Sequence, residues 1–135
     1  MKEYKGEFRS KDGMKTGEWK VTVDEKLKLL KHVCIDKMEI EGYQDTLNCI
    51  VNELKKFNKG EPLYLIDMSP CSTKFLTSEM MKFSNEFTAF MEPYCKKWAG
   101  VIPSFVFRKT VEIFAKGKGR YFSTEREAMD YLLKD

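Results

Sequence analysis

Three ionisable side chains lie where they could take part in catalysis. His32, the only histidine of the chain, falls in a strand-like run and could act as a general base, while Asp36 and Asp67 stand at predicted strand ends. No nucleophile pattern such as G-x-S-x-G accompanies the histidine, and neither aspartate has a second carboxylate at a fixed spacing. We therefore expect a surface or partly packed histidine, a loop-capping Asp67, and a chain that is not an enzyme.

The four cysteines, Cys34, Cys49, Cys71 and Cys95, do not have the spacing of a metal or redox site. They contain no C-x-x-C pair, and one histidine is too few to complete a zinc site around scattered cysteines. Reduced cysteine behaves as a small apolar residue, so we expect free and mostly buried thiols. No metal and no cofactor is predicted.

The run from Lys116 to Arg120 places three cations on a glycine-containing loop. Glycines free backbone N–H groups to bind an anion, but the glycine spacing and the terminal Lys-Ser/Thr of a P-loop are missing. A solvated turn is the favoured interpretation. The net charge is only +3, so nucleic acid is not an expected partner.

The segment 77–98 is rich in methionine and phenylalanine, which recur at spacings of three and four and so predict an amphipathic helix. Such a stripe usually packs into the core. Soft, adaptable side chains also line apolar cavities and grooves. If this helix covers a ligand cavity, the residues expected to bound it are Met80, Phe83, Phe87, Met91 and Phe107.

Other segments would position these residues. Alternating apolar side chains from Trp19 to Val23 predict a half-buried strand, and a second strand over 27–35 would pair with it in a hairpin. A short helix over 25–31 is the competing prediction. The further elements expected are strands at 62–69, 99–107 and 120–122, and helices at 38–57, 77–98, 110–115 and from Thr124 onward, where Glu127 would complete a capping box.

Strands and helices alternate along the chain, which predicts an α/β domain with a mixed sheet of four to five strands. The 135 residues, 42% of them hydrophobic and 33% charged, suit one globular domain. Residues 1–17 are polar and predict an N-terminal extension or an edge strand. No apolar run is long enough to span a bilayer and the start has no apolar signal core, so we expect a cytoplasmic protein without stable membrane insertion.

This order of elements, with three local segments, resembles the SpoIIAA-like branch of the STAS superfamily, whose founding members are anti-sigma-factor antagonists. The first segment, LYLIDMS at 63–69, is similar to the family's central strand, which ends in an Asp and leads into a loop. The second is the strand that begins at Ala99 after a long helix. The third, RYFSTEREAMDYLLKD at 120–135, is similar to the closing element of the group. The resemblance implies a single SpoIIAA-like domain over residues 18–135.

The resemblance also implies a regulatory site. In classical antagonists a phosphorylatable serine lies in an Asp-Ser-Ser-Gly-like motif at the start of the helix after the central strand. Here Ser78 matches the serine, whereas Thr77 replaces the Asp, Met80 follows and the Gly is absent. A phosphate on Ser78 would face the positive end of the helix dipole, although Glu79 would repel it. The alternative is that Thr77 and Ser78 only cap the helix.

Together these features predict a non-catalytic regulatory or binding domain that acts through a protein partner. The candidate phosphoacceptor or partner surface comprises Ser69, Thr77 and Ser78. The alternative function is binding or sensing of an apolar small molecule or lipid in the cavity lined by methionine and phenylalanine. A homodimer is a further expectation, because domains with edge strands and a hydrophobic helix face often self-associate.

Overall fold

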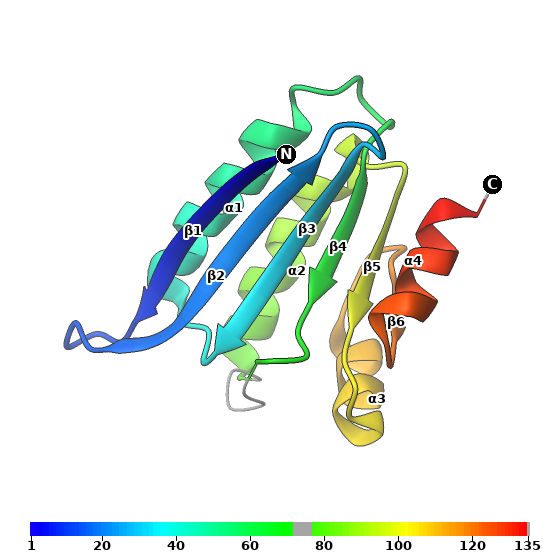
Figure 1. Ribbon diagram of the computed structural model, residues 1–135. Coiled ribbons are helices and arrows are strands. Elements are labelled where there is room, and N and C mark those ends of the chain that lie inside the picture. Colours follow the sequence, from blue (N-terminus) through cyan, green and yellow to red (C-terminus); the bar gives the residue numbers. More distant parts are fainter. Residues whose placement is uncertain (72–76, 135) are drawn as a thin grey trace.

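The chain folds around a mixed sheet of six strands in the order β1-β2-β3-β4-β5-β6, shown in Figure 1 as a computed structural model. The structure describes residues 1–71 and 77–134. The first three strands pair antiparallel, and each later strand pairs parallel with the one before it. Their bounds are β1 Lys2–Arg9, β2 Lys15–Asp24, β3 Leu29–Asp36, β4 Leu63–Asp67, β5 Lys97–Val101 and β6 Arg120–Phe122.

Strand β1 makes the sheet larger than the four to five strands that the sequence predicts. Its residues are mostly polar, and the alternation that marks β2 is weak there. A tight hairpin turn nevertheless folds β1 back onto β2, with Gly13 at φ +86° and the N–H of Ser10 donating to the Met14 carbonyl over 2.9 Å. Backbone pairing and burial of Phe8 hold this strand in place, which propensity alone does not indicate.

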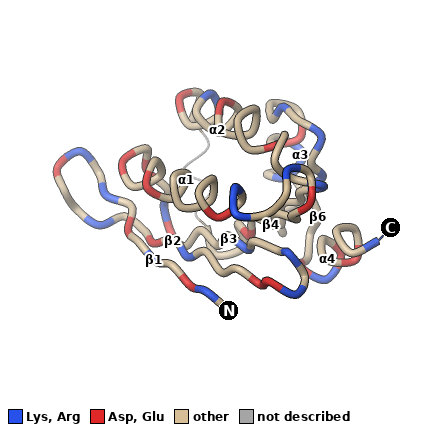
Figure 2. The backbone as a smooth tube through the Cα atoms, turned by 90° about the horizontal axis from the view of Figure 1, so that it is seen from above, with Lys and Arg blue, Asp and Glu red and all other residues tan. Residues whose placement is uncertain are grey.

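Three helices lie on one face of the sheet and the fourth lies on the other (Figures 1 and 2). Each crossover between the parallel strands moves in the same direction across the sheet, and right-handed connections then place the three crossover helices on one face. The helix that follows the last strand lies on the opposite face. The bounds are α1 Ile40–Leu54, α2 Ser78–Met91, α3 Phe105–Phe114 and α4 Glu125–Leu133.

The core has two parts because the central strand β4 is buried on both faces. Tyr64 faces α1 and α2, whereas Leu63 and Leu65 face α4. The larger cluster joins the first three helices to the sheet, and the smaller one joins Ala128 and Leu132 of α4 to β4 and β5. Ala128 and Leu132 are therefore the buried face of α4.

Two predicted boundaries are wrong near residue 100. The helix predicted over 77–98 ends at Met91, because Pro93 follows in a short 3-10 turn, and Trp98 belongs to β5. The strand predicted over 99–107 ends at Val101. Pro103 then separates β5 from α3, whose cap is Ser104, and the hydroxyl of that serine accepts the Phe107 N–H over 3.3 Å. The short helix predicted at 110–115 is the second half of α3.

The competing prediction of a helix over 25–31 is wrong, because residues 25–28 form a turn and β3 starts at Leu29.

The predicted N-cap of the last helix is confirmed, since Thr124 accepts the Glu127 N–H over 3.2 Å. The Glu127 carboxylate accepts from the hydroxyls of Ser123 and Thr124, which lowers its pKa. None of the described helices combines the length and apolar character that crossing a bilayer requires.

Candidate functional site

Ser69 lies at the carboxyl end of the parallel strands, where α/β domains commonly present functional groups. Strand β4 ends at Asp67, whose carboxylate accepts the Ser69 N–H over 2.9 Å, so Asp67 shapes the turn as predicted for a capping residue. The chain then returns to the end of β3, where the Asp36 N–H donates to the Pro70 carbonyl over 2.9 Å. These bonds hold Ser69 at the surface, where it is exposed.

Thr77 and Ser78 form the start of α2, at the same end of the sheet as Ser69, the lower end in Figure 1. Both side chains are exposed. The Thr77 hydroxyl caps the helix by accepting the Met80 N–H over 3.1 Å, whereas Ser78 is the first helical residue. The predicted partner surface also includes residues 72–76, which lie outside the described residues.

Helix α3 adds an apolar surface that the sequence prediction missed. Four of its apolar side chains are 59–75% exposed: Phe105, Val106, Ile113 and Phe114. The start of α3 follows β5 and lies at the same end of the sheet as the start of α2 (Figure 1). We call these four residues, together with Ser69, Thr77 and Ser78, the α2–α3 surface.

Two cations lie against the Phe105 ring of the α2–α3 surface. The Arg108 guanidinium lies 5.7 Å and the Lys109 ammonium 5.6 Å from the centre of the Phe105 ring. Arg108 also donates to the Ile102 carbonyl over 2.8 Å, which fixes its side chain at the start of α3. An exposed aromatic ring next to an oriented arginine is a combination enriched in protein interfaces.

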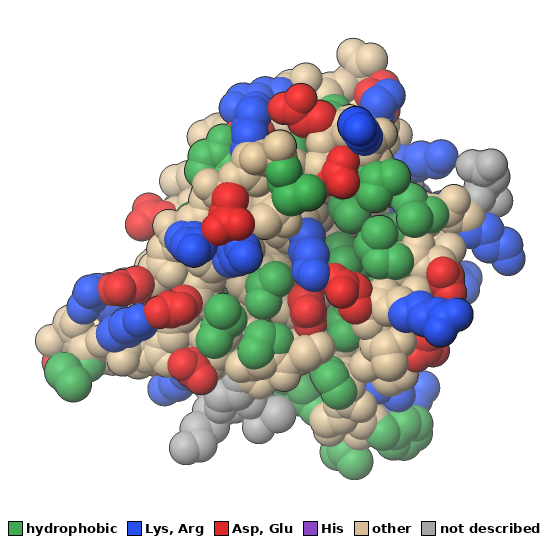
Figure 3. Space-filling view, in the orientation of Figure 1, with side chains coloured by type: hydrophobic (Ala, Val, Ile, Leu, Met, Phe, Trp, Pro, Cys, Tyr) green, Lys and Arg blue, Asp and Glu red, His purple; other side chains and the backbone are tan. Residues whose placement is uncertain are grey.

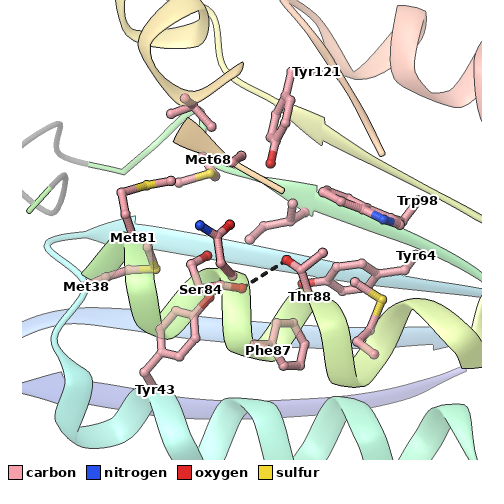
Figure 4. A pocket seen from close by; sticks show the side chains of 15 residues that line it. Met38, Tyr43, Tyr64, Met68, Met81, Ser84, Phe87, Thr88, Trp98 and Tyr121 are labelled. Atoms are coloured by element: carbon pink, nitrogen blue, oxygen red, sulfur yellow. Dashed lines mark hydrogen bonds between the residues drawn. The ribbon is translucent and has the colours of Figure 1, made fainter. Parts of the chain in front are cut away.

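A small cavity of about 40 Å³ lies between the sheet, α2 and α3 (Figure 4). Phe87 and Met91 of the predicted ligand-cavity set line it, and Trp98 and Tyr121 close it from the sheet. The other three members are placed differently: Met80 and Phe107 are buried in the surrounding core, and Phe83 packs edge-on against Tyr43, with ring centres 5.2 Å apart. The predicted set is therefore only partly brought together.

The cavity wall is apolar and uncharged but carries several hydroxyl groups. Figure 4 shows Tyr43 directed toward Ser84 of α2, and the Thr88 hydroxyl donates to the Ser84 carbonyl over 2.9 Å. Burial raises the pKa of Tyr121 to about 12 and also raises the pKa of Tyr64, so these phenols stay neutral. The volume suits roughly one or two water molecules and is far below the roughly 300 Å³ of a typical small-molecule site.

His32 is fully buried, so the expectation of a surface or partly packed histidine is wrong. It lies on the core face of β3, where its Nδ1 is 2.9 Å from the Tyr64 hydroxyl and its Nε2 is 3.5 Å from the Cys34 sulfur. Burial lowers the pKa of His32 to about 3 and raises that of the Cys34 thiol. This chain of three side chains is neutral at physiological pH and closed to solvent, which suits a structural role.

The loop from Lys116 to Arg120 is tied to α2 by its own backbone. The Lys116 N–H donates to the Asn85 side chain over 2.9 Å, and the Lys118 N–H donates to the Glu92 carboxylate over 2.6 Å. The same carboxylate accepts the Trp98 indole N–H over 2.8 Å. Because these N–H groups already have acceptors, the geometry favours the predicted turn over an anion site.

A metal site is not evident in residues 1–71 and 77–134, where no group of three His, Cys, Asp or Glu side chains could hold a metal ion. Cys34 is buried, and Cys49, Cys71 and Cys95 are partly buried thiols. The cysteines therefore lie in the fold largely as apolar side chains do.

Comparison with known proteins supports the fold. Neither a family model nor a curated protein matches the sequence. Among solved structures, an uncharacterized protein from the DUF3478 family with a SpoIIAA-like fold, from Shewanella loihica PV-4, has a TM-score of 0.61 at 17% identity, over 96% of this chain and 93% of that chain. An anti-sigma factor antagonist from Mycobacterium paratuberculosis has a TM-score of 0.57 at 11% identity, over 94% of this chain and 100% of that chain. The predicted SpoIIAA-like relationship is thereby confirmed at the level of the fold.

Proposed function

We propose that this protein is a non-catalytic regulatory domain that acts in the cytoplasm by binding a protein partner at the α2–α3 surface. The observation that carries the proposal is the exposure of Phe105, Val106, Ile113 and Phe114 on one helix, which starts at the same end of the sheet as α2. Exposed apolar side chains that gather on one element mark an interaction site more often than scattered ones do. The similarity in fold to an anti-sigma factor antagonist agrees with a role in protein binding.

The small size of the cavity beneath α2 also supports a protein partner. A ligand-binding domain needs an internal volume that fits its ligand, whereas a partner-binding domain can have a closed core and an exposed apolar surface. Here the cavity measures about 40 Å³, while α3 leaves two phenylalanine rings in solvent. The apolar groups available for binding therefore lie outside the core.

Site-specific photo-crosslinking tests this proposal. A photoreactive amino acid at Val106 or Ile113, which are 73% and 75% exposed, should give a defined adduct in cells that produce the native protein. The matched control is the same amino acid at Asp130, an exposed residue of α4 on the opposite face of the sheet. Aspartate at both Val106 and Ile113 should abolish binding of the identified partner without unfolding the protein. Equal adducts from position 130, or none from α3, would contradict the proposal.

Ser78 is the residue that would regulate this surface. A phosphate there would add about two negative charges at the positive end of α2, at the same end of the sheet as the start of α3. Ser78→Asp should change the affinity for the partner found by crosslinking, and Ser78→Ala should leave it unchanged in unphosphorylated protein. Identical affinities for both variants, with no phosphate on Ser78 in protein from its native cells, would refute this regulation.

A second function is binding of an apolar small molecule in the cavity beneath α2. The observation that favours it is the uncharged wall, to which Phe87 and Met91 contribute. The ligand would have to move α2 or α3 outward, because the present volume is too small. Native mass spectrometry should then show a bound mass that Phe87→Trp removes, while Phe90→Trp, an exposed position on the same helix, retains it. The bare chain mass under gentle conditions would exclude this function.

A further inference from the structure

Strand β1 forms one edge of the sheet, and its outward side chains alternate in charge. In the described part of the chain β1 pairs with β2 alone, so its other side has no strand partner, and Gly42 at the start of α1 packs against the Glu7 carbonyl there. Glu3, Lys5, Glu7 and Arg9 share the face of the sheet opposite α1, and their side chains are 42–71% exposed. Figure 3 shows positive and negative side chains interspersed along this edge, at the left of the view.

We propose that β1 pairs antiparallel with β1 of a second copy of this chain, about a twofold axis at Gly6. In an extended strand, alternate residues direct both their N–H and C=O groups to the same side. Half of the residues of β1 use these groups toward β2, so only the other half can bond across the edge. A symmetric antiparallel pair must therefore be centred on a residue, which leaves a small number of registers.

Among the three registers centred on Lys5, Gly6 and Glu7, charge selects one. Centred on Gly6, the pairing places Glu3 opposite Arg9 of the second copy and Lys5 opposite Glu7 of the second copy, and symmetry repeats both pairs. Centred on Lys5, it would place that lysine opposite itself and Glu3 opposite Glu7. Centred on Glu7, it would place that glutamate opposite itself and Lys5 opposite Arg9. Opposite charges directly across two strands stabilise the pair and like charges destabilise it, so the Gly6 register is favoured.

On the other face of the edge Phe8 is fully buried by its own chain, so the side-chain contacts of this register are those of the outward, charged face. Gly6, at the axis, leaves room for the Trp19 indole on its own sheet, since a side chain there would begin 2.3 Å from that ring. The Trp19 indole therefore fills the space over Gly6 at the centre of the proposed interface.

This edge lacks two of the features that usually prevent strand pairing. Edges are protected by short strands, proline, charged side chains, bulges or a covering helix or loop. Strand β1 has eight residues and no proline; its four outward charges sum to zero, and its one irregularity is a register shift between Phe8 and Arg9. Those charges already have neighbours within the chain, such as Glu3 with Lys20 at 3.4 Å and Glu7 with Lys15 at 3.9 Å, so a second copy meets a neutral surface.

A charge-swap experiment tests the proposal. One variant, Glu3→Lys with Glu7→Lys, makes the edge positive, and the other, Lys5→Glu with Arg9→Glu, makes it negative. Sedimentation equilibrium should show a dimer for the wild type and a dissociation constant at least tenfold higher for each variant alone. An equimolar mixture of the two should form heterodimers, identified by their intermediate mass in native mass spectrometry. Recovery on mixing also shows that both variants are folded.

The matched control is Asp45→Lys with Glu86→Lys, which makes the same change in net charge at exposed residues of α1 and α2. It should dimerise like the wild type. The proposal is overturned if the wild type stays at the monomer mass of 15.9 kDa at all concentrations, if the edge variants dimerise like the wild type, or if mixing restores nothing. None of these substitutions touches the α2–α3 surface, so this result does not depend on the proposed function.

Discussion

Lowering the pH should destabilise this protein through His32 before its carboxylates protonate. Burial lowers the pKa of this histidine to about 3 in the folded chain, against about 6.5 when it is exposed to water. As the pH falls through 6.5, the unfolded chain therefore takes up a proton that the folded chain does not. The stability that His32 contributes is complete above about pH 6.5 and is lost as the pH falls toward 3.

The two pKa values give the size of the effect. Between pH 7 and pH 5 the free energy of unfolding should fall by about 2 kcal/mol. With a urea dependence of roughly 2 kcal/mol per molar, this lowers the unfolding midpoint by about 1 M. Carboxylates with lowered pKa values, such as Glu61 and Glu127, lose their contribution only below about pH 4.5, so they hardly affect this interval.

Urea titrations at the two pH values, followed by fluorescence of the buried Trp19 and Trp98, measure this change. The matched control is His32→Leu with Tyr64→Phe, which removes both partners of the 2.9 Å hydrogen bond together. His32→Leu alone leaves the Tyr64 hydroxyl buried without that partner, so it should cost about 1–3 kcal/mol at pH 7. If the wild type and the double variant lose equal stability between pH 7 and pH 5, the prediction that His32 is buried and neutral in the folded chain is refuted.

Three further substitutions test the fold by the same urea titration. Gly42→Ala should lower the free energy of unfolding by well over 1 kcal/mol, because φ is +88° and the new Cβ would lie 2.3 Å from a backbone oxygen of β1. Gly60→Ala, at φ +82° in open space, should cost only about 1 kcal/mol. Equal losses for the two variants would contradict this. Thr77→Ala should cost about 1 kcal/mol through the lost cap, and Ser78→Ala less than about 0.5 kcal/mol; the reverse order would show that Ser78 is the cap. Phe107→Ala should cost about 3–5 kcal/mol, and a loss under 1 kcal/mol would mean that α3 is not packed as described.

Periodicity alone was enough to predict the elements that bury a face. Burial on one or both faces explains the apolar alternation of β2, the nearly continuous apolar run of β4 and the three-and-four spacing in α1 and α2. Each buried position selects an apolar residue type, so the pattern can be read from the sequence. The SpoIIAA-like fold follows from the order of those elements. Strand β1 does not show this pattern clearly, because much of its stabilisation comes from backbone pairing with β2.

The parts that the sequence could not reveal depend on where one element meets another. Helix α3 exposes several apolar residues, so its hydrophobic pattern does not mark one buried side, and Phe107 was assigned to a strand although Ser104 caps a helix there. The sequence predicts a surface or partly packed His32, because it shows no catalytic partner for this single histidine. Its burial becomes intelligible only when β4 brings Tyr64 within hydrogen-bonding distance.

The two proposed surfaces lie on different parts of the fold, and this separation has a consequence for binding. Strand β1 is at one edge of the sheet, while α3 connects the last two strands near the other edge (Figure 1). A dimer formed through β1 would leave both α2–α3 surfaces exposed, so it could bind a dimeric partner at two points. Bivalent binding raises the apparent affinity by roughly 100-fold or more when the geometry permits both contacts.

The charge-swap variants should then bind such a partner more weakly when tested singly, although their α2–α3 surface is intact. Their affinity for the partner should recover when the two variants are mixed. A monomeric partner should bind the wild type and the edge variants equally, which separates the contribution of the dimer from that of the surface itself.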